Sequence, residues 1–456
     1  MIDSFDDILI IGQKLVIVQE ERTYRISPGE RMIDDRKSIW AWSMYDWANS
    51  AFATTVMAGF FPVFFKAYWA NQANVEESTF YLGLANSISG IIVAALAPFL
   101  GAIADRGSAK KKFLLTFAFL GIVMTGCLWF VEQGFWQMAI LLYVLGAVGF
   151  SGGNIFYDSL LPGVASKKKV DYTSSLGFAM GYIGGGLLFL VNVIMYLKPE
   201  LFGIPDGALA IRISFVSVAV WWAVFSIPVM LWVEEPIIFE SVGLKDSVVL
   251  GLRQLLETFR EIRHLKVVGM FLLAYWFYMD GVDTIIRMAV DYGMSLGFPA
   301  SALITALLMV QFIAFPATLL YYWLGTKIGV KTAIFTSIIA YSLITILGYL
   351  MSEIWHFYAL AAAVGLFQGG IQALSRSLYT RIIPVEKAAE FFGFYNMLGK
   401  FAVVIGPVLM GSVALLTGNV RYGILSVLIL FLLGAYFLAK VDIAEGEKVA
   451  KEYLAK

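Results

Sequence analysis

Charge, cysteine and histidine are all scarce in this chain of 456 residues. Only 14% of the residues are charged, and 33 Lys and Arg balance 33 Asp and Glu, so no net charge points to an anionic partner such as a nucleic acid. The single cysteine, Cys127, excludes an intramolecular disulfide and a multi-cysteine metal site. No Gly-x-x-x-x-Gly-Lys-Ser/Thr string occurs, which argues against an ATP-driven pump. We find no catalytic constellation, and we expect neither an enzyme nor a metal or other cofactor.

Apolar residues, in contrast, make up 60% of the chain, which is more than a soluble protein can bury. Twelve helices of about 20 to 25 residues would accommodate them in a bilayer. No alternating pattern of the barrel type appears, so the spans are predicted to be helices. They lie near 39–68, 80–103, 113–131, 137–162, 175–197, 213–233, 265–290, 301–324, 332–351, 357–380, 391–416 and 422–440.

Basic residues predict the orientation of these spans. Fifteen Lys and Arg fall in the loops after the even-numbered spans, against three in the other loops. Because such residues stay on the cytoplasmic side, both termini are predicted to be cytoplasmic. The first 38 residues show no signal peptide, since the apolar run Ile8–Val18 is interrupted and too short to span.

The same motifs recur in the two halves of the chain. Tyr157–Pro162 at the end of the fourth span matches Tyr379–Pro384 at the end of the tenth, and Gly177-Phe178 matches Gly393-Phe394. Six helices plus six, related by a parallel repeat, is the plan of the major facilitator fold, which binds its substrate between the halves near the membrane midplane. We therefore predict an all-α membrane protein with twelve transmembrane helices in two six-helix bundles.

This plan predicts five segments. They are a cytoplasmic extension (1–38), an N-terminal bundle (39–233), a cytoplasmic linker (234–264), a C-terminal bundle (265–440) and a cytoplasmic tail (441–456). Apolar residues at spacings of three and four over 249–262 indicate an amphipathic surface helix in the linker. A plain connection between the bundles is equally compatible with this pattern.

Ionisable side chains inside the spans are the first functional candidates, since each costs about 2.5–3.5 kcal/mol to insert. Asp46 and Asp158 belong to the N-terminal bundle, whereas Arg376 and Lys400 belong to the C-terminal bundle, and all four lie in the cytoplasmic half. This division suggests ion pairs between the bundles that close a cytoplasmic gate. Lys66 lies close to a helix end and is expected to snorkel.

The seventh span carries Asp280, Asp283 and Arg287 on roughly one face. Asp283 and Arg287 are spaced to neutralise each other, and Asp280 has no base four residues later, so it is the better proton carrier. We predict Asp46, Asp280 and Asp283 as the proton-coupling residues. Both histidines, His264 and His356, sit at helix edges and are poor relays.

Amides share faces with these charges. They complete a predicted substrate-binding set of Asp46, Asn49, Asn154, Gln368, Gln372, Arg376, Asn396 and Lys400, although amides in spans often serve only to pack helices. The predicted gating residues are Asp105, Arg106, Asp158, Arg376 and Lys400. For Asp105 and Arg106, the alternative is an ordinary positively charged loop.

Several strings together resemble the Atg22-like (UMF1) branch of the major facilitator superfamily. They are Tyr45–Phe52, Phe156–Pro162, Gly177–Gly185, Tyr278–Thr284, Gln372–Ser377, Glu390–Lys400 and Gly406-Pro407. The resemblance covers about 37–440 and implies a twelve-helix secondary transporter. We expect it in the inner (cytoplasmic) membrane of a bacterium. The resemblance also implies that Asp46, Asn49, Asp158, Asp280, Gln372, Arg376 and Lys400 are the recurring polar positions. Fungal members are associated with release of amino acids from the vacuole, whereas bacterial members have no settled substrate. The loop after the eighth span lacks the acid of its counterpart, and the N-terminal extension falls outside the resemblance.

We therefore expect proton-linked alternating access by a monomer that moves a small polar solute across the lipid bilayer. An amino acid or short peptide fits best, because Arg376 or Lys400 can meet a carboxylate and Asp46 an ammonium group. Export of hydrophobic or drug-like compounds is the alternative within transport. A non-transporting sensor built on a transporter fold is the alternative of another class, but it gives no reason for acids such as Asp280 within a span.

Overall fold

The computed structural model describes residues 33–70, 109–235 and 265–452, the strands at 8–11, 14–19 and 22–25, and short pieces between 81 and 104. The predicted amphipathic helix at 249–262 and the loop residues Asp105 and Arg106 lie outside the described residues. The same is true of the side chains of Lys66 and Lys400.

The first span is an α-helix interrupted by wider turns. It comprises α1 (Arg36–Ala51), the π-helical η2 (Phe52–Phe60), α2 (Phe61–Phe64) and the π-helical η3 (Phe65–Trp69). Asp35 caps α1 by accepting a hydrogen bond from the Ser38 backbone N–H at 2.9 Å. The buried face of α1 includes Trp42, Tyr45 and Asp46, which places an acid in the interior.

The remaining helices alternate in direction. In the first half they are α4 (Lys110–Cys127), η4 (Leu128–Phe130), α5 (Trp136–Val164), α6 (Val170–Leu197), η5 (Pro199–Phe202), α7 (Gly207–Phe225) and α8 (Ile227–Trp232). In the second half they are α10 (Lys266–Ser295), α11 (Ala300–Ile328), α12 (Val330–Leu350), α13 (Ile354–Ile382), η6 (Val385–Lys387), α14 (Ala388–Thr417), α15 (Val420–Ser426), α16 (Leu428–Ala439) and α17 (Ile443–Glu452).

The length and hydropathy of these helices confirm the all-α membrane class. Among the described residues, eight helical stretches are long and apolar enough to cross a bilayer. The α1–η3 stretch, α10 and α14 coincide with three further predicted spans, and the predicted span at 80–103 is only partly described. The protein is thus a multi-pass membrane protein, and the count of twelve spans stays a prediction.

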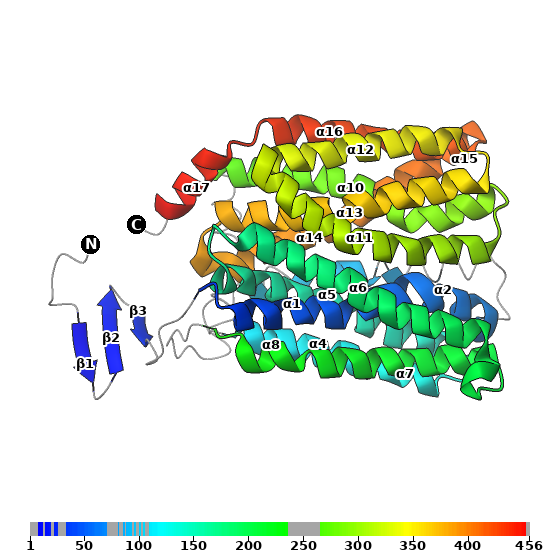
Figure 1. Cartoon of the computed structure of the whole chain (residues 1–456), viewed down its shortest axis with the longest axis horizontal. Helices are drawn as coiled ribbons and strands as arrows, with labels where there is room; N and C mark the ends of the chain where they lie inside the picture. Colours follow the sequence, from blue (N-terminus) through cyan, green and yellow to red (C-terminus); the bar gives the residue numbers. More distant parts are fainter. Residues whose placement is uncertain are drawn as a thin grey trace.

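Three short strands precede the helices. β1 (Ile8–Ile11), β2 (Lys14–Gln19) and β3 (Arg22–Arg25) form an antiparallel sheet in the order β1-β2-β3. The sequence pattern of this segment predicts no regular structure. Figure 1 shows the strands β1–β3 and the helix α17 on the same side of the helical bundle, which we call the terminal end.

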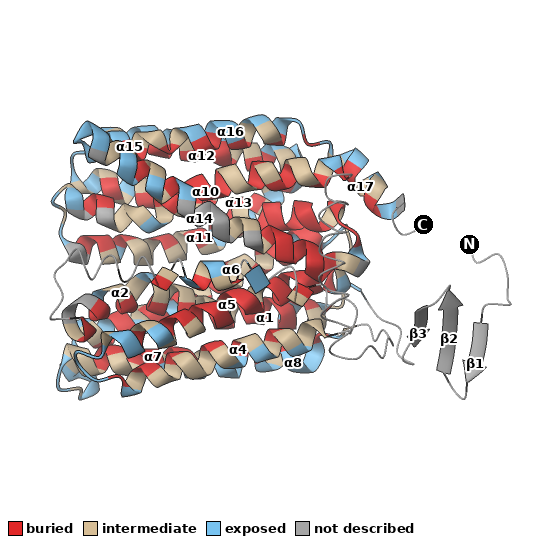
Figure 2. Cartoon of the chain, turned by 180° about the vertical axis from the view of Figure 1, so that it is seen from behind, coloured by how far each residue is buried: buried red, intermediate tan, exposed pale blue. Residues whose placement is uncertain are grey.

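The buried hydrophobic residues form two separate clusters. One lies within residues 39–233, with Ala389 of α14 added, and the other lies within 265–441. Outward side chains are apolar as well, for example Phe119 (69% exposed) and Leu416 (85% exposed), as expected for a surface that faces lipid. Figure 2 shows buried residues concentrated on the inner sides of the helices.

The two halves meet along α6 and α11, with α13 also against α6 and α14 against α5. Glycines allow this close approach: a Cβ at Gly186 of α6 would lie 3.0 Å from the Cβ of Gln311 on α11. The interface between the halves is therefore built from backbone-to-backbone proximity as well as from side chains.

Gly149 provides a test of helix packing within the first half. A Cβ there would lie 2.4 Å from the backbone nitrogen of Gly121 on α4, so Gly149→Ala must push α4 and α5 apart. We expect a loss of about 1–3 kcal/mol in stability, measured by thermal unfolding in detergent. Gly163→Ala, on the same helix with nothing within 4 Å of the added Cβ, is the matched control and should unfold at or above the wild-type temperature. Equal behaviour of the two variants would contradict the close packing.

Candidate functional site

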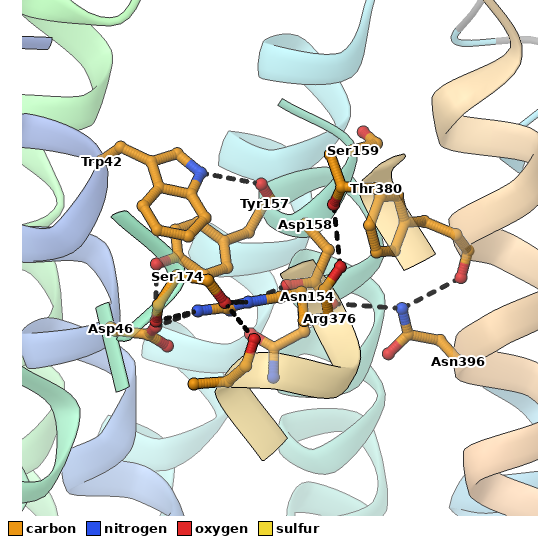
Figure 3. A network of polar contacts seen from close by, with 12 residues as sticks. Trp42, Asp46, Asn154, Tyr157, Asp158, Ser159, Ser174, Arg376, Thr380 and Asn396 are labelled. Carbon is orange, nitrogen blue, oxygen red and sulfur yellow. Dashed lines mark hydrogen bonds and ion pairs between the residues drawn. The ribbon is translucent and has the colours of Figure 1, made fainter. Parts of the chain in front are cut away.

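Arg376 is the centre of a buried polar network that joins the halves. It lies six residues before the end of α13, about 9 Å from the terminal end. Its Nη1 is 3.0 Å from Asp158 Oδ1 on α5, and its Nη2 is 3.5 Å from Asp46 Oδ2 on α1. Nε donates to Ser174 Oγ and Nη2 to the Ser174 carbonyl on α6, both at 2.9 Å. Figure 3 shows this single guanidinium in contact with Asp46, Asp158 and Ser174, which belong to α1, α5 and α6 of the other half.

Aromatic rings surround the guanidinium. Its central carbon lies 4.2 Å from the ring centroid of Phe178 and 4.9 Å from that of Trp42. Trp42 stacks on Tyr157 with centroids 4.2 Å apart, and the Tyr157 hydroxyl donates to Asp46 Oδ2 at 2.8 Å. Burial of a charge is tolerated only when its partners are hydrogen-bonded and well placed, and these rings and hydroxyls satisfy that condition.

Gly177 leaves room for this arrangement. A Cβ at this position of α6 would lie 2.7 Å from Asp46 Oδ2 and 2.8 Å from the Tyr157 hydroxyl. Any larger residue would displace the acid that Arg376 binds. The Gly177-Phe178 pair therefore has a structural role in the first half. The glycine leaves space for Asp46, and the phenylalanine ring covers the Arg376 guanidinium.

A second layer of contacts closes the terminal end. Arg381 forms an ion pair with Asp171 of α6, and Asp171 also accepts a hydrogen bond from Ser377. The Lys167 ammonium donates to the Arg381 carbonyl at 3.0 Å. Burial lowers the pKa of Lys167, and the Glu447 carboxylate of α17 acts in the opposite direction. The halves are thus held together between Arg376 and the terminal end.

A cavity of about 180 Å³ opens beyond Arg376. Both halves line it: Asp46, Asn154, Tyr157, Asp158 and Phe178 come from the first, and Tyr275, Met279, Asp283, Arg287, Gln372, Arg376, Tyr395, Asn396 and Gly399 from the second. Since one water needs roughly 10–15 Å³ by this kind of measure, there is room for a small solute. The lining runs toward Arg287, about 30 Å along α10 from the terminal end.

Most of the predicted site residues meet in this region. Of the predicted binding set, Asp46, Asn154, Gln372, Arg376 and Asn396 line the cavity, as do Asp158 and Asp283 from the other predicted sets. The pairing of N-terminal acids with a C-terminal base is observed for Arg376. Asp105, Arg106 and the side chain of Lys400 lie outside what the structure describes, so their predicted contacts stay predictions.

The predicted amides differ in their contacts. Asn49 donates to Asn154 Oδ1 at 2.6 Å, which ties α1 to α5. Gln372 accepts from the Tyr182 hydroxyl at 2.7 Å across the halves, and Asn396 lies 3.4 Å from Asp158 Oδ2. Gln368 is buried, with 9% of its surface exposed, and is not part of the described cavity lining.

Several contributors were not predicted. Arg381 was counted only as a loop charge, and Asp171 and Ser174 were not considered. The nearest signal in the sequence is an acid, Asp171, two residues after the basic run Lys167–Lys169. For Ser174 we find no signal, because a serine at a helix start is common.

Two halves around a polar cavity, closed at one end by ion pairs between the halves, are the architecture of a transporter of the major facilitator class. A solved structure agrees in fold: the human organic anion transporter MFSD10 (TETRAN) matches with a TM-score of 0.69 at 13% identity, over 88% of this chain and 99% of that chain.

The family is shown by sequence. The family model described as "Vacuole effluxer Atg22 like" matches residues 74–451, and this chain belongs to that family. It is 38% identical to an uncharacterized MFS-type transporter, YxiO, of Bacillus subtilis, over 90% of this chain and 96% of the relative. It is 24% identical to autophagy-related protein 22 of Yarrowia lipolytica, over 81% of this chain and 76% of the relative. The resemblance drawn from the sequence is confirmed: the chain is an MFS-type membrane transporter rather than an enzyme.

The buried arginine gives a stability test. Arg376→Gln leaves Asp46 and Asp158 buried without their base, and we expect a loss of about 3–5 kcal/mol in unfolding experiments in detergent. Adding Asp158→Asn should restore part of this loss, because it removes one uncompensated acid. Arg421→Gln is the control, since Arg421 donates to the Tyr349 carbonyl in the second half alone. Strictly additive losses in the double variant would argue against the pair.

Proposed function

We propose that this protein is a proton-linked secondary transporter of small zwitterionic solutes, most simply an amino acid or a short peptide. The observation that carries the proposal is the lining of the cavity. Asp46 and Asp283 supply negative charge, Arg376 and Arg287 supply positive charge, and Asn154, Gln372 and Asn396 supply amides. A carboxylate and an ammonium on one solute need both signs within a single water-excluding site.

Arg376 gives the site a means of coupling. A substrate carboxylate competes with Asp46 and Asp158 for the guanidinium, and a proton on either acid weakens the same hold. Both events loosen contacts between the halves at the level of Arg376. Binding and protonation therefore act on the same step, which is the opening of the terminal end by rocking of one half against the other.

The basic loops support a cytoplasmic location of the terminal end. With that end closed, the cavity would face the opposite side of the membrane. A Bacillus relative at 38% identity supports the cytoplasmic membrane of a bacterium as the location, the membrane that in bacteria with two membranes is the inner one. We further propose that a single chain acts alone in the bilayer, since the cavity is completed by the two halves of one chain.

Export of apolar or drug-like compounds is the second candidate. The observation that favours it is the aromatic part of the lining, which includes Tyr157, Phe178, Tyr275 and Tyr395. Such rings bind flat or cationic molecules as readily as they shield an arginine. Transport of a zwitterion uses Arg376 to bind the solute carboxylate, whereas export of an apolar or cationic compound does not.

A ligand screen separates these candidates. Purified protein is heated with amino acids, dipeptides, sugars or cationic drugs, because a ligand that binds the folded state raises the unfolding temperature. We expect shifts with amino acids or dipeptides that are lost in Arg287→Gln and Asp283→Asn and retained in Arg421→Gln. Variants at Arg287 and Asp283 are chosen because Arg376→Gln perturbs the fold itself. Shifts confined to lipophilic cations would favour drug export, and no shift with any class would favour a sensor.

Proton coupling is tested with the solute that the screen identifies. In liposomes, Asp46→Asn is expected to retain exchange of solute for solute and to lose most accumulation driven by a pH gradient, because exchange needs no net proton movement. Asp206→Asn is the control, since Asp206 is an exposed cap of α7 that accepts from the Leu209 N–H and Asn caps equally well. Unimpaired gradient-driven accumulation in Asp46→Asn would remove this acid from the coupling path.

A further inference from the structure

Asp280 lies outside the cavity, in the interior of the second half. It is 1% exposed, on α10, one turn before the cavity residue Asp283. Oδ1 accepts from the Gly406 backbone N–H at 2.9 Å and lies 3.4 Å from Thr284 Oγ1. Oδ2 is buried and has no hydrogen-bond partner among the described residues. Oδ1 of this acid is thus hydrogen-bonded, whereas Oδ2 has no hydrogen-bond partner among the described residues.

The contact with α14 is built for this acid. A Cβ at Gly406 would lie 1.8 Å from Thr284 Oγ1 and 2.7 Å from Asp280 Oδ1, so only glycine lets α14 come this close. Pro407 follows inside α14 and has no N–H to continue the helix ladder, which makes this point a natural bend. Asp280 therefore lies at the contact between α10 and α14, at the point where the hydrogen-bond ladder of α14 is interrupted.

No base among the described residues neutralises Asp280. The titratable groups of the surrounding helices make their described contacts with other residues. On α13, the Tyr379 hydroxyl donates to the Phe391 carbonyl, and Arg376 pairs with Asp46 and Asp158. The rings of Tyr395 on α14 and Tyr341 on α12 stack on Tyr275 and Phe431, and the Tyr341 hydroxyl is a neutral group without a hydrogen-bond partner among the described residues. On α10 itself, Asp283 and Arg287 line the cavity. On the far side of α10, α16 presents Phe431 and Gly434. The side chain of Lys400 on α14 lies outside the described residues.

We propose that Asp280 is a proton-binding site separate from the solute cavity, occupied in this conformation by a proton on Oδ2. A carboxylate with one unpaired oxygen in this interior would be an uncompensated buried charge, whereas the protonated acid is neutral. A metal cation fits less well, because hard cations take about six or more oxygen ligands and an N–H donor already points at this carboxylate. The described residues also contain no group of three or more His, Cys, Asp or Glu side chains that could hold a metal ion.

This site deepens the proposed function and rests on it only for its role in coupling. α14 carries Asn396, beside Asp158 of the Arg376 network, and Gly406, at Asp280, ten residues or about 15 Å apart. A bend of α14 at Gly406-Pro407 would change both contacts together. Release of the proton from Asp280 is then linked to opening of the terminal end, without any shared ligand.

The test is infrared difference spectroscopy of the purified protein in liposomes, which needs no substrate. We expect a carbonyl band of a protonated carboxyl group at neutral pH that is lost in Asp280→Asn and retained in Asp283→Asn. Asp280→Asn should also unfold at the wild-type temperature, because the amide has the shape of the neutral acid. The infrared band reports only the protonation of Asp280. A negative result in the transport assays would therefore not contradict this proposal.

Three results would overturn the proposal. The first is a band that persists unchanged in Asp280→Asn. The second is loss of the wild-type band on addition of Na⁺ at constant pH, which would assign the site to a metal cation. The third is failure of Asp280→Asn to fold, because a neutral isostere is tolerated wherever the native acid is neutral.

Discussion

The burial of one guanidinium between two halves of the chain is the constraint on which the rest of this structure depends. Arg376 cannot lie inside the bundle without partners, and its partners come from α1, α5 and α6 of the other half. The aromatic rings around it, the glycine opposite Asp46 and the hydroxyl of Tyr157 all serve to place or shield this charge. Because these partners belong to the other half, the strength of the contacts that Arg376 makes with them determines how firmly the halves are held together at its level.

The fold was largely predictable from sequence, because long apolar stretches and an internal repeat leave few alternatives. Asp46, Asp158 and Arg376 were predictable for a related reason. A charged side chain costs free energy to insert into a membrane, so its presence in a span indicates an ion pair or a functional site. Ser174 and Asp171 were not, because a serine or an acid near a helix start is ordinary until the facing helix is known. The position of Asp280 away from the cavity also depends on helix rotation, which hydropathy does not report.

The two layers of the closed end use equivalent strings of the internal repeat. Tyr157-Asp158-Ser159 and Tyr379-Thr380-Arg381 are equivalent strings near the ends of α5 and α13. In the first half the string supplies an acid to the opposite arginine, and in the second it supplies an arginine to the opposite acid. The two charges stand at neighbouring positions of the repeat, since Asp158 matches Thr380 and Ser159 matches Arg381. Each half thus contributes one charge of opposite sign from the end of an equivalent helix to the contacts between the halves.

The glycines of α6 have a consequence for the way this seal breaks. Added Cβ atoms at Gly181 and Gly185 would lie 2.6 Å from the Ser50 Oγ and 3.0 Å from the Ser50 carbonyl, so α6 and α1 are pressed together with no side chain to cushion them. Two helices in such contact move as a single rigid lever. A motion that separated the halves would then withdraw Asp46 on one helix and Ser174 on the other from Arg376 together, so that these contacts would break cooperatively rather than one after another.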